Sequence, residues 1–216
     1  MNNPGHLITE IKVILFCLKD RALQVLVHPL KQFSQVSFPA GPIQAGFTLE
    51  ENAQNCLQGL LPANEIYLEQ LYTYGNTLDD EGQRHLSVVY FALLPNNISV
   101  LQDQTIIWML VAEQISLVPS EREMLLYALR RLRYKLEYTA VGFELLPETF
   151  SLSELQHTYE IILDESLDKR NFRRRILQAN IIEPTPHRKT GEGRPATLYR
   201  YRSDAVAEIK ARRLFP

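Results

Sequence analysis

A short basic segment near the C-terminus carries the side chains with the most informative chemistry. In KRNFRRRILQ, residues 169–178, helical periodicity places Phe172 and Ile176 on one narrow apolar face. The rest of the helix surface carries hydrogen-bond donors, namely Lys169, Arg170, Asn171, Arg173, Arg174 and Gln178. Arg can form two hydrogen bonds with guanine, and Asn or Gln can do the same with adenine. The pattern therefore predicts a helix that could contact base edges in the major groove of a DNA duplex.

A second basic segment follows directly, IIEPTPHRKTGEGRPATLYRYR at 181–202. Its β-prone ends, 181–183 and 198–202, bracket a loop rich in Gly, Pro, Lys and Arg, which predicts a β-hairpin with a long basic tip. From that tip we expect backbone or minor-groove contacts by Arg188, Lys189, Thr190 and Arg194. Residues 168–202 hold 10 Lys and Arg against 3 Asp and Glu. A solvated surface is the alternative, but the charge falls in both elements that would touch a duplex together.

The segment GPIQAGFTLEENAQNCLQGL, residues 41–60, has the outline of a phosphate-handling site, because a glycine-opened loop runs into a short helix. Its only acids, Glu50 and Glu51, lie in the first turn, where the positive end of the helix dipole stabilises a carboxylate. A divalent cation needs several oxygen atoms that converge on one point. We therefore expect structural roles for both acids, with no metal and no cofactor; a metal bound in a shifted register is the alternative.

The N-terminal half predicts a sheet with one helix. Runs rich in Val, Ile, Leu and Tyr predict strands at 7–18, 22–30, 67–75, 84–94 and 105–115. The first two strands are separated only by the polar residues KDR, which indicates a tight turn. A turn at 39–41 precedes a helix that begins at the N-cap Thr48 and is stopped by Pro62. These elements predict an α+β domain over residues 1–118.

The C-terminal half predicts three helices and the basic hairpin. Ser120 with Glu123, and Ser151 with Glu154, form the pattern of a capping box at the start of two helices. The first helix repeats apolar residues along one stripe, and we expect it to be a linker over residues 119–140. The basic helix is capped by Asp168 and ends at Asn180. Helix, helix and basic hairpin make a winged helix-turn-helix arrangement, which predicts a DNA-binding domain over residues 141–216.

Composition is that of an ordinary globular protein, with 216 residues, 45% hydrophobic and 22% charged. Net charge is −2, but residues 1–120 hold 5 basic and 11 acidic side chains, whereas the remainder holds 18 and 14. No run approaches the apolar length of about 20 residues that a membrane span needs. The N-terminus has no secretory signal pattern, and the 2 Cys form neither a disulfide framework nor a zinc site. We expect a cytoplasmic protein without a membrane partner.

Residues 7–118 resemble a Nudix domain in the order strand, turn, helix, YLEQLYTYGN, acidic turn and SVVYFALL. The stretches KLEYTAVGFELLPETFSLSELQHTYEIIL, LDKRNFRRRIL and GRPATLYRYR resemble the Nudix-related transcriptional regulator family. The resemblance implies an α+β fold, a Nudix-like mixed sheet with helices followed by a winged helix. It also implies a ligand-responsive regulator, expected to be a repressor, that binds double-stranded operator DNA as a homodimer and controls NAD-related or sugar metabolism.

The resemblance also implies that catalysis has been lost. When the Nudix motif is aligned from Gly41, its first Glu becomes Phe47, and its Arg-Glu-hydrophobic-x-Glu-Glu stretch becomes NCLQGL at 55–60. Of the motif only Gly41 and Leu57 remain, so we expect no catalytic residue and no enzyme. The alternative is a Nudix-type hydrolase of nucleoside diphosphate derivatives with a nucleic-acid-binding tail.

The Nudix-like cleft is the implied place for a small effector such as ADP-ribose or a related nucleotide or sugar. By resemblance, the side chains around it are Tyr72, Tyr74, Asn76, Arg84 and His85. The tyrosines could instead be ordinary half-exposed strand residues, and Arg84 a solvated turn charge. A further alternative is a dimerisation scaffold without any effector.

Overall fold

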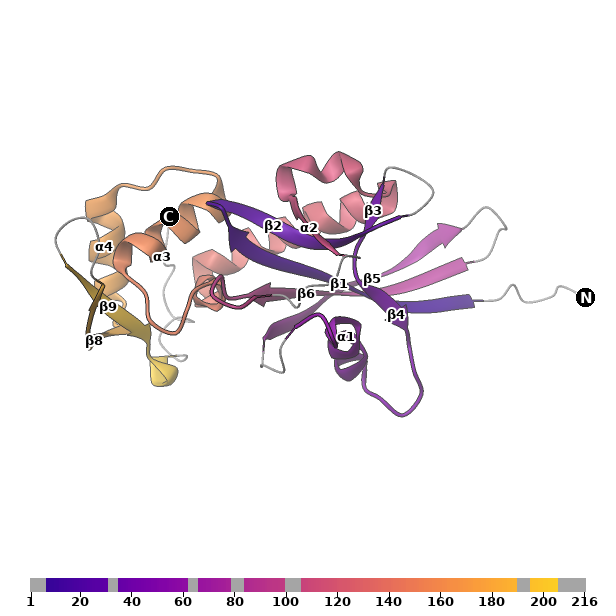
Figure 1. Ribbon diagram of the computed structural model, residues 1–216, viewed down its shortest axis with the longest axis horizontal. Helices are drawn as coiled ribbons and strands as arrows, with labels where there is room; N and C mark the ends of the chain where they lie inside the picture. Colours follow the sequence, from indigo (N-terminus) through magenta and orange to yellow (C-terminus); the bar gives the residue numbers. More distant parts are fainter. Residues whose placement is uncertain are drawn as a thin grey trace, which may run out of the picture. The chain divides into compact units, whose positions relative to one another are not determined.

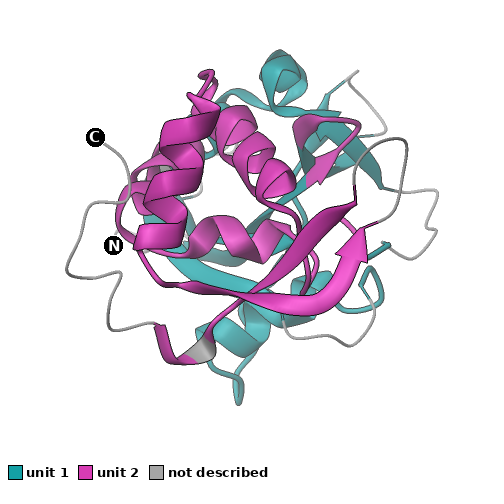
Figure 2. Ribbon diagram, turned by 90° about the vertical axis from the view of Figure 1, so that its left-hand side faces the viewer, with its two compact units in different colours: residues 1–17, 24–94, 98–128 teal, residues 18–23, 95–97, 129–216 magenta. Residues whose placement is uncertain are grey.

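The computed structural model describes residues 7–30, 35–61, 66–78, 84–99, 106–189 and 195–205 (Figure 1). The chain folds into two compact units, coloured separately in Figure 2. Unit 1 comprises residues 1–17, 24–94 and 98–128, and unit 2 comprises 18–23, 95–97 and 129–216. In the described part of the chain, no helix combines the length and the apolar character that crossing a membrane requires.

A mixed sheet forms the body of unit 1. Strands β1 (Leu7–Lys19) and β2 (Ala22–Pro29) are joined through Asp20 and Arg21, both with positive φ, the backbone that a tight hairpin turn requires. Strand β6 (Arg84–Leu94) runs parallel to β1, and β5 (Tyr67–Leu78) runs antiparallel to β6. The sheet order is β3-β2-β1-β6-β5. The sheet predicted from the sequence is confirmed, although β5 extends beyond the predicted residue 75.

Short strands complete this sheet. β3 (Val36–Ser37) pairs with β2, and β4 (Ala40–Pro42) pairs with β1, so part of the predicted turn at 39–41 is a strand. β7 (Ile107–Leu110) also pairs with β2, and a 3-10 helix, η1 (Val111–Ser116), follows it. The predicted strand at 105–115 is therefore wrong in length, because the chain leaves the sheet after four paired residues.

One face of the sheet packs against α1 (Leu49–Leu57). Alternating residues of β1 and β6, such as Val13 and Tyr90, are buried there with Ala53 and Leu57 of the helix. The helix ends at Leu57 because Gln58 is extended and Gly59 has a φ of +80°, which glycine adopts without strain. The predicted end at Pro62 is therefore wrong, and Pro62 itself lies outside the described residues.

Helix α2 (Pro119–Tyr138) begins two residues earlier than a capping box of Ser120 with Glu123 would require. Pro119 occupies the first helical position, where its missing N–H costs nothing. Ser120 consequently lies inside the first turn, and the predicted capping box with Glu123 is wrong. The predicted apolar stripe is confirmed, since Met124, Leu125, Ala128, Leu132 and Leu136 are all buried.

Unit 2 holds a compact helical core and a two-stranded hairpin. After η2 (Val141–Leu145) come α3 (Leu152–Leu163) and α4 (Lys169–Gln178). The capping box of Ser151 with Glu154 and the Asp168 cap are confirmed. The rings of Tyr159 and Phe172 pack edge to face between the helices, with centroids 5.6 Å apart. Asn180 adopts a left-handed φ of 54° just after α4, as the sequence predicts.

The hairpin strands β8 (Ile182–Lys189) and β9 (Ala196–Tyr201) are longer than the predicted β-prone ends. Arg188 and Lys189 therefore lie on β8 and not on the loop, which corrects their predicted place; Thr190 and Arg194 fall outside the described residues. The main chains of Phe150 and Tyr199 exchange hydrogen bonds of 2.9 and 2.7 Å, which ties β9 to the segment before α3. A short 3-10 helix, η3 (Ser203–Ala205), follows.

Candidate nucleic-acid interface

Helix α4 separates its apolar and polar side chains sharply. Phe172 and Ile176 are buried, with 2% and 0% of their surface exposed. The side chains of Lys169, Arg170, Arg174 and Gln178 are exposed. The Asp168 carboxylate accepts a hydrogen bond of 2.7 Å from the Asn171 backbone N–H, which fixes the start of the helix. The predicted arrangement of α4, with one packed face and one donor-bearing face, is therefore present.

Three of the predicted donors, Asn171, Arg173 and Arg174, form side-chain contacts that affect their roles. Arg174 Nη2 donates to Asn171 Oδ1 at 2.8 Å, so these side chains orient each other. Arg173 is different, because its Nη2 donates to Ser153 Oγ on α3 at 3.1 Å. Its Nε is buried and has no hydrogen-bond partner within the described ranges. Arg173 therefore lies against α3 and does not join the exposed donors.

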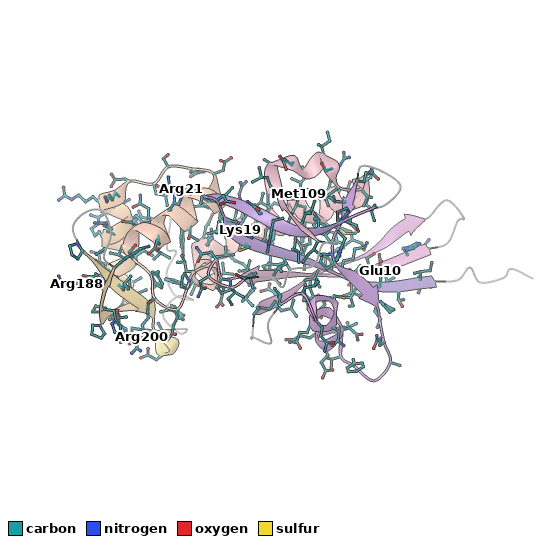
Figure 3. The ribbon with its side chains drawn as sticks, in the orientation of Figure 1. Glu10, Lys19, Arg21, Met109, Arg188 and Arg200 are labelled. Atoms are coloured by element: carbon teal, nitrogen blue, oxygen red, sulfur yellow. The ribbon has the colours of Figure 1, made fainter. Side chains whose placement is uncertain are left out.

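The hairpin adds exposed cations on both of its strands. Figure 3 labels Arg188 and Arg200 on its two strands. Arg200 Nε lies 2.6 Å from Glu183 Oε1, and Arg188 is exposed. Lys189 Nζ lies 2.6 Å from Oε1 of Glu154, which belongs to the capping box of α3. We call the hairpin of β8 and β9 the wing. Its cations Arg188, Lys189 and Arg200 are not equivalent, since Lys189 and Arg200 have a carboxylate partner.

Glu154 has a second function that the sequence did not reveal. Its Oε2 accepts hydrogen bonds from the backbone N–H and the hydroxyl of Ser151, each at 2.8 Å. Partial burial raises the pKa of Glu154, but the hydrogen bonds from Lys189 and Ser151 outweigh burial and lower it. The capping pattern identified Glu154 as a cap, whereas its contact with a lysine 35 residues later depends on the tertiary fold.

In unit 1 the structure brings together part of the predicted effector set. The rings of Tyr72 and Tyr74 on β5 are 5.2 Å apart, and Tyr72 also lies 5.9 Å from Tyr127 of α2. Tyr72 remains 56% exposed. We call these three side chains the tyrosine cluster. They lie on the face of the sheet opposite α1, because Tyr72 and Tyr74 pair with Val89 and Ser87, whereas Val88 and Tyr90 face α1.

The other predicted effector residues are placed differently. Along β6, His85 lies on the face of the tyrosine cluster, and Arg84 alternates to the opposite face. Arg84 Nη1 donates to the Gly75 carbonyl at 3.3 Å. Asn76 belongs to β5, but its side chain is outside the described residues. The predicted residues are therefore neighbours along two paired strands and do not all face one side.

The loop before α1 is shaped by an amide side chain. Asn52, only 3% exposed, accepts a hydrogen bond of 2.9 Å from Gln44 N and donates one of 2.8 Å to the Thr48 carbonyl. Phe47, at the position of the first Nudix Glu, is 50% exposed on this loop. Sequence reasoning missed Asn52, and no local pattern marks it.

The Glu51 side chain caps helix α1. Glu51 accepts from the Thr48 backbone N–H at 2.6 Å and from its hydroxyl at 2.9 Å, and the backbone hydrogen bond lowers its pKa. Glu51 thus completes a capping box with Thr48, which confirms the N-cap predicted at Thr48 and gives Glu51 a structural role beyond the predicted interaction with the helix dipole. Within the described ranges, no group of three or more His, Cys, Asp or Glu side chains is placed to hold a metal ion.

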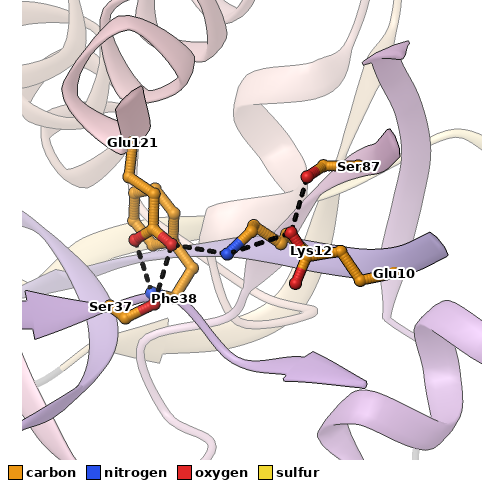
Figure 4. A network of polar contacts seen from close by, with 6 residues as sticks. All are labelled: Glu10, Lys12, Ser37, Phe38, Ser87 and Glu121. Carbon is orange, nitrogen blue, oxygen red and sulfur yellow. Dashed lines mark hydrogen bonds and ion pairs between the residues drawn. The ribbon is translucent and has the colours of Figure 1, made fainter. Parts of the chain in front are cut away.

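A buried charged network joins the sheet of unit 1 to the first turn of α2 (Figure 4). Glu121, 1% exposed, accepts hydrogen bonds from Lys12 Nζ at 2.8 Å, Ser37 Oγ at 2.7 Å and Phe38 N at 2.9 Å. Lys12 also lies 3.4 Å from Glu10, which accepts from Ser87 Oγ at 2.6 Å. Burial lowers the pKa of Lys12, but its two carboxylate neighbours more than compensate and raise it.

The structure thus combines a Nudix-like sheet with a winged helix, in which helix α4 carries exposed cations. The family model for the NrtR DNA-binding winged helix domain matches residues 142–201. The ADPR responsive transcriptional repressor NtrR of Acinetobacter baylyi is 34% identical over 212 residues, which cover 92% of this chain and 83% of that protein. The chain therefore belongs to the NrtR family of Nudix-related transcriptional regulators.

Solved structures support the same fold. NrtR of Shewanella oneidensis in complex with a 27mer DNA is 27% identical, with a TM-score of 0.82 over 95% of this chain and 96% of that chain. A MutT/nudix family protein from Enterococcus faecalis is 15% identical, with a TM-score of 0.67 over 93% of this chain and 90% of that one, and shares the fold. The predicted fold class, a Nudix-like mixed sheet with helices followed by a winged helix, is confirmed.

Proposed function

We propose that this protein is a ligand-responsive transcriptional repressor. Residues 141–216 bind operator DNA, residues 1–118 sense a small molecule, and residues 119–140 link the two functions. The observation that carries this proposal is α4, whose exposed Arg170 and Arg174 stand on a helix anchored by buried Phe172 and Ile176. An anchored helix with outward-facing arginines fits the major groove, where Arg reads guanine.

The effector is a small molecule such as ADP-ribose or a related nucleotide or sugar. The 34% identical relative is named for its response to ADPR, and that likeness supports the choice. Tyr72, the exposed member of the tyrosine cluster, supplies aromatic surface on which a base could stack. The regulated genes then belong to NAD-related or sugar metabolism, and the protein acts as a cytoplasmic homodimer.

The Nudix-like domain senses and does not hydrolyse. Phe47 replaces the first motif Glu, the stretch 55–60 lacks the others, and the acid Glu51 is engaged in capping. A divalent metal would find too few converging oxygen atoms here. The alternative, a Nudix-type hydrolase with a nucleic-acid-binding tail, requires carboxylates at these positions.

The test measures binding of the full chain to a duplex from the region upstream of its own gene, by fluorescence anisotropy, with a random-sequence duplex for comparison. We expect preferential binding to the upstream duplex, and a change in that affinity on addition of ADP-ribose. Thermal unfolding with ADP-ribose, NAD, nucleotides and pentoses identifies the ligand, because a ligand of the folded state raises the melting temperature. If the protein bound DNA but none of these compounds changed either measurement, unit 1 would be a scaffold without this class of effector.

A further inference from the structure

Lys189 differs from the other cations that we expect to meet DNA. Among the residues that the structure describes, Lys169, Arg170, Arg174 and Arg188 have no carboxylate within ion-pair distance. Lys189 has one, because its Nζ lies 2.6 Å from Glu154 Oε1. Among these cations that we expect to meet DNA, Lys189 is therefore the one whose charge is already opposed by a carboxylate in the described part of the protein.

The carboxylate that opposes Lys189 is fixed in place. Glu154 Oε2 is held by the backbone N–H and hydroxyl of Ser151, so only Oε1 is turned toward Lys189. The side chains of both partners remain partly exposed, at 57% for Lys189 and 37% for Glu154. An exposed ion pair of this kind is weak enough to be exchanged for a DNA phosphate. After such an exchange, however, the fixed carboxylate would remain beside the phosphate and repel it.

We propose that Glu154 is a negative determinant of DNA affinity, which competes with the DNA backbone for the Lys189 ammonium group. This inference rests on the proposed function. Glu154 limits non-specific binding, because the cation that it opposes would otherwise attract any phosphate, whatever the sequence. Recognition of the operator then depends more strongly on the base contacts of α4, and less on the wing.

The test uses Glu154→Gln, which removes the charge and keeps the cap, since Gln replaces Glu in capping boxes. Binding to a random-sequence duplex is measured between about 50 mM and 200 mM salt for the wild type and the variant. We expect the variant to bind more tightly at low salt, with a slope of log affinity against log salt steeper by about 0.9, the value of one additional phosphate contact.

Lys189→Ala completes a double-mutant cycle. In the wild-type background it should change affinity for random DNA by less than about twofold, because Lys189 is opposed by Glu154. In the Glu154→Gln background it should remove the whole gain in affinity and slope. Glu183→Gln is the matched control, because it breaks an ion pair of equal length, 2.6 Å to Arg200, on the same strand. It should leave the slope unchanged.

Each other outcome overturns the inference. Weaker binding by Glu154→Gln, with an unchanged melting curve, would make Glu154 a residue that positions the wing. Two results would contradict competition by Glu154. One is an equal salt slope for Glu154→Gln and the wild type, and the other is an equal gain in affinity for random DNA on Glu183→Gln. If the wild type bound neither the upstream duplex nor random DNA at low salt, the proposed function itself would fail, and that result is distinct from the others.

Discussion

Arg170 and Arg174 leave α4 one turn apart but have different neighbours. Arg170 is exposed and free of any ion pair within the described ranges, whereas Arg174 is bonded to Asn171. A donor already oriented by a neighbour loses less side-chain entropy when it binds a base. The two arginines should therefore contribute to sequence recognition in different ways.

Replacing Arg170 by Ala should cost about 1–3 kcal/mol of binding free energy on the true operator and hardly change binding to random DNA. The reason is that a base contact exists only on the correct sequence. Titrations of both duplexes at several salt concentrations measure this. Asn171→Ala and Arg174→Ala should be non-additive in the same assay, since one side chain orients the other. Equal losses on both duplexes would assign Arg170 to the phosphate backbone.

Lys12→Met should lower the free energy of unfolding by about 3–5 kcal/mol, because it leaves Glu121 buried without its cation. Urea unfolding measures the loss. The double variant with Glu121→Gln should lose less than the sum of the two single variants, because the uncompensated charge is then absent. Additive losses would mean that the pair contributes nothing beyond packing.

The same network predicts how stability responds to alkaline pH. The folded-state pKa of Lys12 is raised, so its contribution is complete below the unfolded value of about 10.4 and is lost as pH rises through the folded value. Above about pH 10 the unfolding free energy of the wild type should therefore fall more steeply than that of Lys12→Met. Parallel curves would show that Lys12 does not titrate with unfolding.

The first residue of a helix was predictable from the sequence where a capping residue marks it. Asp168 and the Ser151–Glu154 pair mark the starts of α4 and α3 because a cap is a contact over three residues. Ser120 misled because Pro119 had already begun α2. The length of β8 and the contact of Lys189 with Glu154 were not predictable, since both depend on residues distant in sequence. For the same reason, the Lys12–Glu121 pair, 109 positions apart, left no local pattern.

Asn52→Ala tests an element that the sequence did not reveal. The substitution leaves the Gln44 N–H without its acceptor, whereas the Thr48 carbonyl keeps the hydrogen bond of 3.0 Å from the Asn52 backbone N–H. We expect a loss of about 1–3 kcal/mol in unfolding free energy. Amide hydrogen exchange should accelerate at Gln44 in particular. Gln54→Ala, on the same helix but exposed, is the control and should have little effect. Unchanged exchange at Gln44 would show that the loop keeps its shape without Asn52.

For the whole molecule, we expect catalytic silence. With magnesium or manganese, the purified protein should not hydrolyse ADP-ribose or dinucleotides, because residues 47 and 55–60 lack the required carboxylates. Product formation is compared with that of heat-denatured protein. Metal-dependent turnover above that control would favour the hydrolase alternative.

We also expect the whole molecule to act as a pair. A single winged helix presents one short recognition helix, and two-fold pairing on an inverted repeat doubles the contact with DNA. Sedimentation should give a dimer at micromolar concentration and two chains per operator. A monomer that binds one chain per site would contradict this prediction.

The hydrogen bonds between the Asn52 side chain and the loop before α1 have an evolutionary consequence. In a hydrolase, the loop before the helix is constrained by the metal that its carboxylates must hold. Here the loop obtains its shape from Asn52, so selection on position 47 is separated from selection on the fold. Phe47 is half exposed, so we expect its replacement to leave the domain folded. Across the lineage, we therefore expect position 47 to drift or adapt to new ligands while position 52 stays invariant.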